Sequence, residues 1–517
     1  MARRLDGRRA GGFARLDDRA RRAARHLQPA GRRADDRRRD LAAHRAHWRV
    51  APLAEHRHDD RRSEGWRLDR RPLPALPAAT RGDRDGTIGL DAKFTVRRGL
   101  VLAGTINPDF RNVERQILGI DHSYTEKALG ENRPFFVDGN SYLPESATFY
   151  TWRVGEMYGG LKLYGTAGAH RIGFLEAYDR DQVNHVTGRW MWQLRPRVEV
   201  MNQFAWRHGP EGIRPRADVP LAEDHLTWVG QIRRGWARER KDDWFAVRGG
   251  FTRTASDSGN GHEIRISFDR FARPGALNVE MYVMQRSGGY LPADGLLPKA
   301  DTDVRQGAIF ASYTMEYDRP WIRQWWVKGL VRRGIRFDGD LYLQIFSIGA
   351  GGEIRRGLGV YSELMSYERP PYRDRMGYFS IGWNDDRLYS SGSVNTQVGQ
   401  VAGTDYLYVG AEQGVHLAEP LSVDIEAQYV RRDFPVGHVE RPAGGVAESW
   451  QAWMTATFDL TTERAISGRV ARTSDGTNGY ASYRQTVRRG MDVFLIVGDP
   501  SATTWTSRVA LKAAIVL

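Results

Sequence analysis

Apolar and polar side chains alternate along many stretches of the chain between residues 87 and 517. In the stretch LSVDIEAQY, which begins at Leu421, every second residue is apolar and the residues between them are polar. The same period of two recurs at residues 197–207, 263–269 and 277–283. Successive side chains of a β-strand point to opposite faces, so this pattern predicts strands with one apolar and one polar face.

The predicted strands are long and continue to the end of the sequence. Turn signals separate them, such as Asp-Gly at 338–339, Ser-Gly-Asn-Gly at 258–261 and Asp-Gly-Thr-Asn-Gly at 475–479. Strands of about ten residues are longer than those of a soluble β-sandwich but typical of a transmembrane barrel. No blade-length repeat indicates a propeller. We therefore predict a large antiparallel transmembrane β-barrel of roughly 20–24 strands, closed by a strand at 509–517.

Aromatic and charged residues have places in such a barrel. The chain has 16 Trp, 21 Tyr and 19 Phe, and several lie near predicted strand ends, where a membrane barrel carries aromatic girdles. The examples are Trp321, Trp325, Trp326, Trp450 and Trp453. Charged side chains can face the lumen without contacting lipid. No apolar run approaches the ~18 residues of a membrane-spanning helix, which excludes an α-helical membrane protein.

Residues 1–86 differ in composition from the rest of the chain. They contain 24 Arg and 13 acidic residues but no Lys, Ile, Asn or Tyr. One interpretation is a disordered head with too few large apolar residues to fold. Another is GC-rich DNA translated out of frame, in which case the native N-terminus and any secretion signal are missing. The third is a basic arm that binds nucleic acid or a membrane surface.

The segment that begins at Ile106, INPDFRNVERQILGIDHSYTEKALGENRPFFVDG, does not alternate. Irregular backbone cannot face lipid, because its unpaired amides would cost several kcal/mol each. We predict that residues of about 107–145 fold inward as a plug or constriction. In this prediction Arg133 pairs with carboxylates in the lumen, and Phe135 and Phe136 pack the segment against the wall. The alternative is a surface loop without a role in the pore.

The same segment is rich in carboxylates, which raises the question of catalysis. Glycoside hydrolysis needs two carboxyl groups a few ångströms apart, and Glu114 and Glu131 are the candidates. Carboxylates are also the ordinary composition of a polar loop. The histidines lack metal-ligand spacing, and cysteine is absent. The sequence indicates no metal site and no cofactor.

Three separated motifs resemble a bacterial outer-membrane β-barrel family of uncharacterised function. They are INPDFRNVERQ, ENRPFFVDG followed by the strand TFYTWRVG, and the late hairpin YRQTVRRGMDVFLIVGDP. The resemblance covers residues 87–517, and Asn132, Val137 and Asp138 depart from the family pattern. The positions that match the first two motifs are Asn107, Pro108, Asp109, Phe110, Glu114, Glu131, Arg133, Pro134, Phe135, Phe136 and Gly139.

Members of that family usually carry a carbohydrate-binding family 9-like domain before the barrel and are sometimes labelled membrane-associated hydrolases. The resemblance implies a bacterial outer-membrane location, contact with outer-membrane lipid and a link to carbohydrate. Residues 1–86 stand where the front domain would end, so no residue here is assigned to sugar binding. We rank a passage or export pore, or a membrane anchor, first. A membrane-embedded hydrolase of a glycan or lipid is second, and nucleic-acid binding is last. The sequence does not indicate the oligomeric state.

Overall fold

The computed structural model describes Pro77–Ala78 and residues 89–517. Within that range it leaves out residues 109, 111–116, 124–125, 211–223, 239–240, 255–259, 318, 320, 355–356, 385–388, 489–490, 500–504, 506–507 and 516–517. The Arg-rich head predicted for residues 1–86 lies outside the described residues, apart from the two-residue strand β1 at Pro77–Ala78.

The described chain is built almost entirely of β-strands. The short helices are α3 (Pro134–Val137) and three 3₁₀ turns, η1 (Asn140–Tyr142), η2 (Thr151–Arg153) and η4 (Lys299–Asp301). The long strands are β2 (Leu90–Arg97), β3 (Leu100–Ile106), β4 (Met157–Ala167), β5 (His170–Asp179), β6 (Asn184–Arg195), β7 (Val198–His208), β8 (Asp224–Arg238), β9 (Lys241–Thr254), β10 (Gly261–Ala272), β11 (Leu277–Arg286), β12 (Val304–Glu316), β13 (Ile322–Arg336), β14 (Leu341–Ile354), β15 (Leu358–Arg369), β16 (Tyr372–Trp383), β17 (Ser390–Val401), β18 (Thr404–Ala418), β19 (Leu421–Asp433), β20 (Val446–Thr461), β21 (Arg464–Thr473), β22 (Gly476–Arg488), β23 (Met491–Gly498) and β24 (Val509–Ile515).

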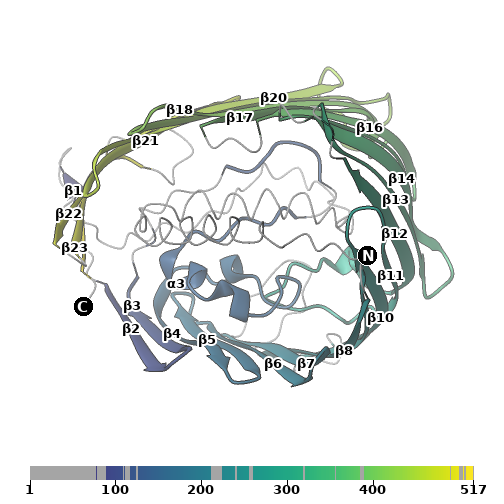
Figure 1. Cartoon of the computed structure of the whole chain (residues 1–517), viewed down its shortest axis with the longest axis horizontal. Helices are drawn as coiled ribbons and strands as arrows, with labels where there is room; N and C mark the ends of the chain where they lie inside the picture. Colours follow the sequence, from purple (N-terminus) through teal and green to yellow (C-terminus); the bar gives the residue numbers. More distant parts are fainter. Residues whose placement is uncertain are drawn as a thin grey trace, which may run out of the picture. The chain divides into compact units, whose positions relative to one another are not determined.

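Each strand from β2 to β24 pairs antiparallel with the next strand in sequence. The resulting sheet bends around to form a large barrel (Figure 1). The 23 strands of this meander fall within the predicted range of about 20–24. The short strand β1 adds to β24, with Pro77 opposite Ala510 and Ala78 opposite Val509. The prediction of a large antiparallel transmembrane barrel with an inward-folded early loop is confirmed.

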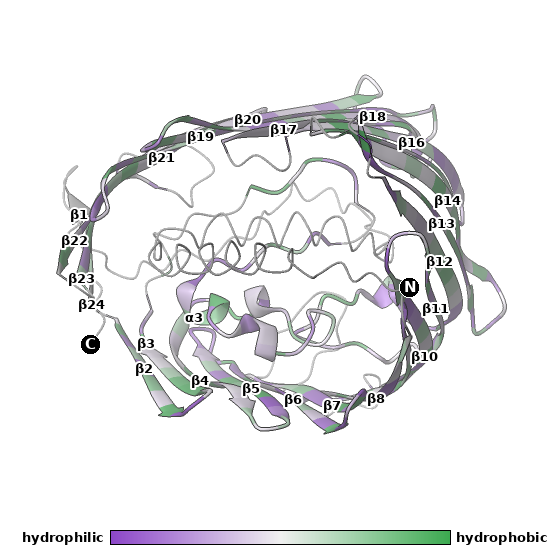
Figure 2. Cartoon of the chain, in the orientation of Figure 1, coloured by the Kyte–Doolittle hydropathy of each residue, from purple (hydrophilic) through white to green (hydrophobic). Residues whose placement is uncertain are grey.

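The two faces of the sheet differ as the sequence pattern predicts, and Figure 2 shows apolar and polar residues alternating along the strands. On β19 the outward residue Ile425 is about half exposed, whereas Gln428 at an inward position is buried. An apolar outward face and a polar inner face are the properties of a transmembrane barrel. The aromatic girdle prediction is wrong for Trp326 and Trp453. They lie at inward positions, because adjacent residues of a strand point to opposite faces.

The connections at the two ends of the barrel differ in length. At one end, from the β2–β3 turn to the β22–β23 turn, they are two to six residues long. The opposite end carries the long connections 107–156, 209–223, 287–303, 434–445 and 499–508. Among the described residues no helix is long and apolar enough to cross a membrane.

Two of the long connections fold into the interior of the barrel. The first, which we name the luminal segment, is residues 107–156 between β3 and β4, and it includes α3 (Figure 1). The second, which we name the second luminal loop, is residues 287–303 between β11 and β12, and it contains buried residues such as Tyr290 and Asp294. The luminal segment and the inner wall of the barrel together form the main apolar cluster.

Candidate functional site

The luminal segment leaves β3 through a fixed turn. Asn107 adopts a left-handed backbone with φ of 49°, a region that asparagine tolerates better than most residues. Its amide donates to the carbonyl of Tyr158, and its side-chain oxygen accepts from Arg180 at 2.7 Å. Pro108 is buried directly after it. These contacts turn the chain from the wall into the interior.

Arg133 is the best-connected side chain of the luminal segment. It precedes Pro134, which disfavours helical backbone at the residue before it, and α3 accordingly begins at the proline. The guanidinium donates to both carboxylate oxygens of Glu131 and to the carbonyls of Thr151 and Val154. Its ion-pair partner inside the barrel is Glu131, two residues away in the same segment. Pairing of this kind is what offsets the cost of burying a charge.

Phe135 and Phe136 lie in the main apolar cluster, where they contact one another edge to face. The wall contributes residues of β4, β5 and β7 to this cluster, and Phe110 packs against it from the luminal segment. The Arg133 guanidinium carbon lies 4.2 Å from the centre of the Phe136 ring. The remaining members of the cluster are Leu143, Phe149, Val154, Met157, Leu175, Ala177 and Ala205.

A buried lysine fixes the end of α3. Lys162 of β4 has no exposed side-chain surface, and its ammonium donates to the carbonyls of Phe135 and Asp138. The Asp138 carboxylate accepts from Tyr164 and pairs with Lys93 at 2.7 Å. Partial burial would raise the pKa of Asp138, but hydrogen bonds from Lys93 and Tyr164 outweigh it and lower that pKa.

Gly139, which follows this anchor, has a structural reason to be glycine. Its φ is 70°, in the left-handed region that glycine adopts without strain. A Cβ atom there would lie 2.5 Å from ring carbons of Tyr164 on β4. The close approach of the backbone to this tyrosine holds the luminal segment against the wall.

The second luminal loop is held by buried carboxylates. Asp294 is almost fully buried, and its Oδ2 lies 2.9 Å from Nδ1 of His185 on β6. His185 also contacts Asp179 at 3.3 Å, and Arg207 lies 3.9 Å from Asp294 Oδ1. Burial alone would raise the pKa of Asp294, but attraction to His185 and Arg207 outweighs it and lowers that pKa.

Asp301 lies near the C-terminal end of the same loop. Its neighbours offset the cost of burying its negative charge less fully than those of Asp294 do. Its carboxylate accepts a hydrogen bond from Tyr342 of β14, and the Arg369 guanidinium lies 3.9 Å away. Burial raises the pKa of Asp301 above its ordinary value despite these partners. Lowering the pH is therefore expected to change the stability of the fold in opposite directions through these two carboxylates.

The luminal segment and the second luminal loop also contact each other. The amide of Tyr150 donates to the carbonyl of Asp294 at 2.7 Å, and the amide of Leu296 donates to the carbonyl of Ser146 at 2.9 Å. Glu145 pairs with Arg248 of β9 at 2.7 Å. The two connections thus form one body against the wall of β4–β9.

The middle of the luminal segment reaches the far wall, which consists of β18–β20. We name residues 117–130 the crossing stretch. The amide of Ile120 donates to Gln428 Oε1 at 2.9 Å, the amide of His122 donates to the Tyr406 hydroxyl at 2.8 Å, and Gln451 donates to the carbonyl of Leu118 at 2.7 Å. Ile120 also packs against Tyr406 and Tyr408.

The crossing stretch is held in shape by its own side chains. Lys127 donates to the carbonyls of Gly119 and Asp121 and pairs with the Asp121 carboxylate at 2.7 Å. Its return to the β4–β9 side is marked by an ion pair between Glu126 and Arg153. A compact turn inside the lumen therefore bridges the two walls.

Of the two predicted catalytic carboxylates, Glu131 alone lies in the described part of the chain. The Glu131 side chain is nearly buried, and its carboxylate forms an ion pair with Arg133. Glu114 and Asp109 lie outside the described residues. In the described part of the chain no group of three or more His, Asp or Glu side chains is placed to hold a metal ion.

Sequence reasoning did not identify several residues that hold the interior together. Lys162 sits at an inward position of a strand, where a lysine is usually read as facing water. Asp294 lies in residues 287–303, a Gly- and Pro-containing stretch of 17 residues that also breaks the alternation. That break was the available signal for a second inward fold.

Comparison with known proteins gives structural likenesses alone. No protein-family model matches the sequence, and no curated protein matches it. The siderophore receptor PirA from Pseudomonas aeruginosa is similar over 72% of this chain and 77% of its own, with 12% identity and a TM-score of 0.45. The open form of the ferric-catecholate import receptor Fiu from E. coli is similar over 69% and 78%, with 11% identity and a TM-score of 0.40.

The translocation pore of the P pilus usher PapC is similar over 69% of this chain and 67% of its own, with 11% identity and a TM-score of 0.30. All three TM-scores are below 0.5, so the class of this protein rests on its own geometry. An outward apolar face, a polar inner wall and an antiparallel meander of 23 strands define a large transmembrane β-barrel with a folded interior.

Proposed function

We propose that this barrel lies in the outer membrane of a bacterium, forms a passage for a solute or polymer, and is narrowed by its luminal segment. A wall of polar residues around a barrel of more than twenty strands suits an aqueous path. Barrels of this kind place their short turns in the periplasm and their long connections outside. The luminal segment and the second luminal loop then enter from the external face.

The observation that carries this proposal is the crossing stretch. It spans from one wall to the other, and its contacts with β18–β20 include three hydrogen bonds, the packing of Ile120 and a ring contact of His122 with Tyr406. None of its described residues is buried. Such a contact is weak enough to release without unfolding the barrel, since one hydrogen bond contributes only about 0.5–1.5 kcal/mol net.

Deletion of Asp121–Leu129 tests the constriction. We expect a higher single-channel conductance in planar bilayers, because the deletion removes the part of the luminal segment that crosses to the far wall. Shortening the exposed β13–β14 turn by removing Asp338 is the matched control, and its conductance should equal that of the parent chain. An unchanged conductance in the Asp121–Leu129 deletion would contradict the proposed constriction.

We further propose that the cargo is polyhydroxylated, in line with the carbohydrate link that the family resemblance implies. The inner wall on the side opposite α3 has tyrosines on neighbouring strands. The rings of Tyr361 and Tyr378 lie 5.7 Å apart, and Gln397 stands between Tyr378 and Tyr408 in the ladder. Aromatic faces beside amide groups suit sugar rings and their hydroxyls, because one supplies apolar contact and the other hydrogen bonds.

Tyr378→Ala tests the cargo. We expect oligosaccharides to slow the ion current of the parent chain and to do so about tenfold more weakly in the variant, since losing a stacked ring removes about 1 kcal/mol or more. Tyr313→Ala, on the outward face, is the control. Equal block of all three proteins would contradict sugar as the cargo while leaving the pore intact. The hydrolase alternative has no support from the geometry, because Arg133 occupies Glu131.

A further inference from the structure

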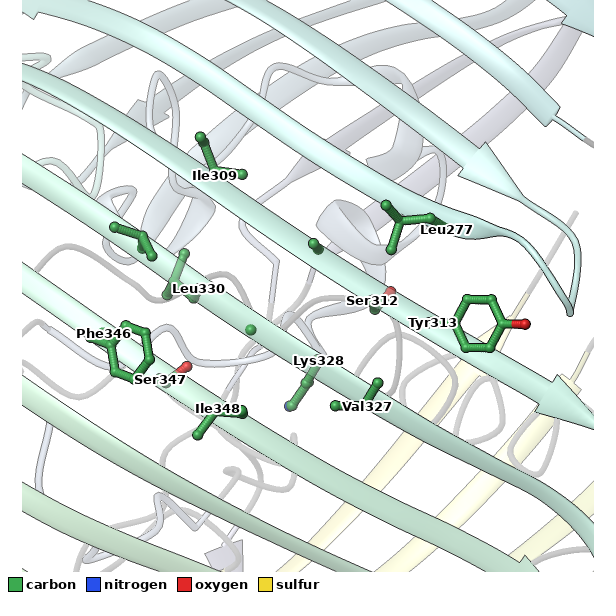
Figure 3. A pocket seen from close by; sticks show the side chains of 13 residues that line it. Leu277, Ile309, Ser312, Tyr313, Val327, Lys328, Leu330, Phe346, Ser347 and Ile348 are labelled. Carbon is green, nitrogen blue, oxygen red and sulfur yellow. The ribbon is translucent and has the colours of Figure 1, made fainter.

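The outward face of β11–β14 contains an open apolar slot of about 370 Å³ (Figure 3). Ala311 and Gly329 face each other across the β12–β13 ladder and form its shallow floor. Larger apolar side chains border the floor, and each is about half exposed. They are Ile309, Val331, Phe346 and Ile348.

Two exposed arginines lie beyond one end of the slot. Arg305 follows the same outward register as Ile309, and Arg333 follows that of Val331. Because Arg305 is opposite Ile335 and Arg333 is opposite Gly307, the two arginines are diagonal neighbours on the ladder. The distance from Ile309 to Arg305 is about 13 Å at the rise of a β-strand. Neither arginine forms an ion pair with another described residue.

We propose that this slot and the two arginines bind one anionic lipid, with an acyl chain in the slot and a head-group phosphate on Arg305 and Arg333. A linear hydrocarbon chain fits a groove made by small residues between larger apolar ones. Arginine binds phosphate through paired N–H donors. The Arg305 guanidinium also lies 4.8 Å from the Phe337 ring, which holds it at the level of the turn rather than over the slot.

A second copy of the chain fits this surface less well. Two barrels inserted in the same direction would meet about an axis normal to the membrane, which brings the same level of each face together. Arg305 and Arg333 of one copy would then face the same arginines of the other, and like charges repel. The charge pattern therefore favours a lipid with a negative head group.

Lipid binding to the purified full chain in detergent tests the proposal. Native mass spectrometry would count adducts during titration with phosphatidylglycerol, phosphatidylcholine or inorganic phosphate. We expect one phosphatidylglycerol adduct that saturates first, and weaker phosphatidylcholine binding. Gly329→Leu, which fills the slot, and the double change Arg305→Gln with Arg333→Gln, which removes the charge-assisted contacts, should each weaken that adduct about tenfold.

Matched controls separate the slot from the rest of the outer face. A Cβ atom at Gly329 would lie 3.5 Å from the nearest atom, so leucine fills the slot without a backbone clash. Gly377 is an outward glycine between Leu364 and Val398, and Gly377→Leu should leave binding unchanged. Arg253→Gln changes an outward arginine elsewhere and should also leave it unchanged.

Three outcomes would overturn the proposal. The first is equal binding of the two lipids, and the second is inorganic phosphate binding alone. The third is a dimer lost in Gly329→Leu, which would assign the slot to a second copy. The inference does not depend on the proposed pore, because the slot lies outside the lumen. Single-channel conductance of the slot variants should match the parent chain even if lipid binding fails.

Discussion

Two parts of the luminal segment are held to the barrel by different forces. The anchored part, residues 131–156, places Phe136, Leu143 and Val154 in the apolar cluster with almost no exposed surface. The crossing stretch, residues 117–130, has no buried residue among those that the structure describes. Burying one large apolar side chain contributes about 1.5–3 kcal/mol, whereas a hydrogen bond contributes about 0.5–1.5 kcal/mol net.

In the proposed pore, this difference separates the part that positions the constriction from the part that forms it. The anchored part shares a core with β4, β5 and β7, so moving it would unfold part of the wall. The contacts of the crossing stretch with the far wall include hydrogen bonds, one packed isoleucine and the edge of the His122 ring against Tyr406. A change of pore width is therefore expected to involve the crossing stretch while the anchored part stays in place.

Removing Arg133 should have the largest effect on this comparison. Arg133→Ala leaves the nearly buried Glu131 without its partner, and breaking one side of a buried ion pair costs about 3–5 kcal/mol. We expect a lower free energy of unfolding and faster proteolysis within residues 131–156. Arg153→Ala, which breaks the pair with the partly exposed Glu126, is the control and should cost less, because water can solvate the carboxylate that is left behind. Equal losses for both variants would mean that the anchored part is no firmer than the crossing stretch.

A change in the second luminal loop is expected to have an effect of intermediate size, which the pH dependence of the melting temperature can test. The pKa of Asp294 is lowered, so its charged form contributes stability above the ordinary value of about 3.9, and this is lost as the pH falls through the lowered pKa. His185, Arg207 and His225 face this carboxylate. Asp294→Asn should reduce the melting temperature at pH 7 and flatten its decline below pH 4.

Asp301 opposes that trend, because burial raises its pKa and its neutral form is favoured in the fold. Asp301→Asn should therefore steepen the decline in acid that Asp294→Asn flattens. Asp338→Asn, in an exposed turn, is the control with no expected effect. Identical pH profiles for the Asp294 and Asp301 variants would refute the opposite roles assigned to the two carboxylates.

The smallest expected effect is at the far wall. Gln451→Leu removes the donor to the Leu118 carbonyl and also a 3.0 Å contact with Gln428, at a cost of about 1 kcal/mol. We expect an unchanged melting temperature but more frequent open events in single-channel records. Asn395→Leu, on the inner wall of β17, is the matched control. A drop in melting temperature without a change in gating would place Gln451 in the fold rather than in the contact that closes the pore.

The architecture was predictable because a single property determines it. A strand that faces lipid on one side and water on the other must alternate apolar and polar side chains. Residues 421–429 show this alternation. The inward fold of residues near 107–145 followed from the loss of that alternation. Assignment of tryptophans to the outer girdle failed at Trp326 and Trp453, because proximity to a strand end does not reveal which face a residue takes.

The contacts inside the barrel were much less predictable. The sequence predicts carboxylates in the lumen as partners of Arg133 but does not identify them, and the structure gives Glu131 and two carbonyls of the same segment. A sequence gives the charge of a side chain but not which carbonyls a folded loop turns toward it. Lys162 and Asp294 were missed for the same reason, since their partners come from residues 24 and 109 positions away.

The number of strands determines how the two edge strands of the sheet, β2 and β24, can pair with each other. Neighbours in the meander run in opposite directions, so with 23 strands β2 and β24 run in the same direction. No ladder joins these two edges in the described part of the chain. Joining them directly would require a parallel pairing, whereas one added strand would restore an even count. β1, which already lies antiparallel on the free edge of β24, runs in the direction that such a strand requires.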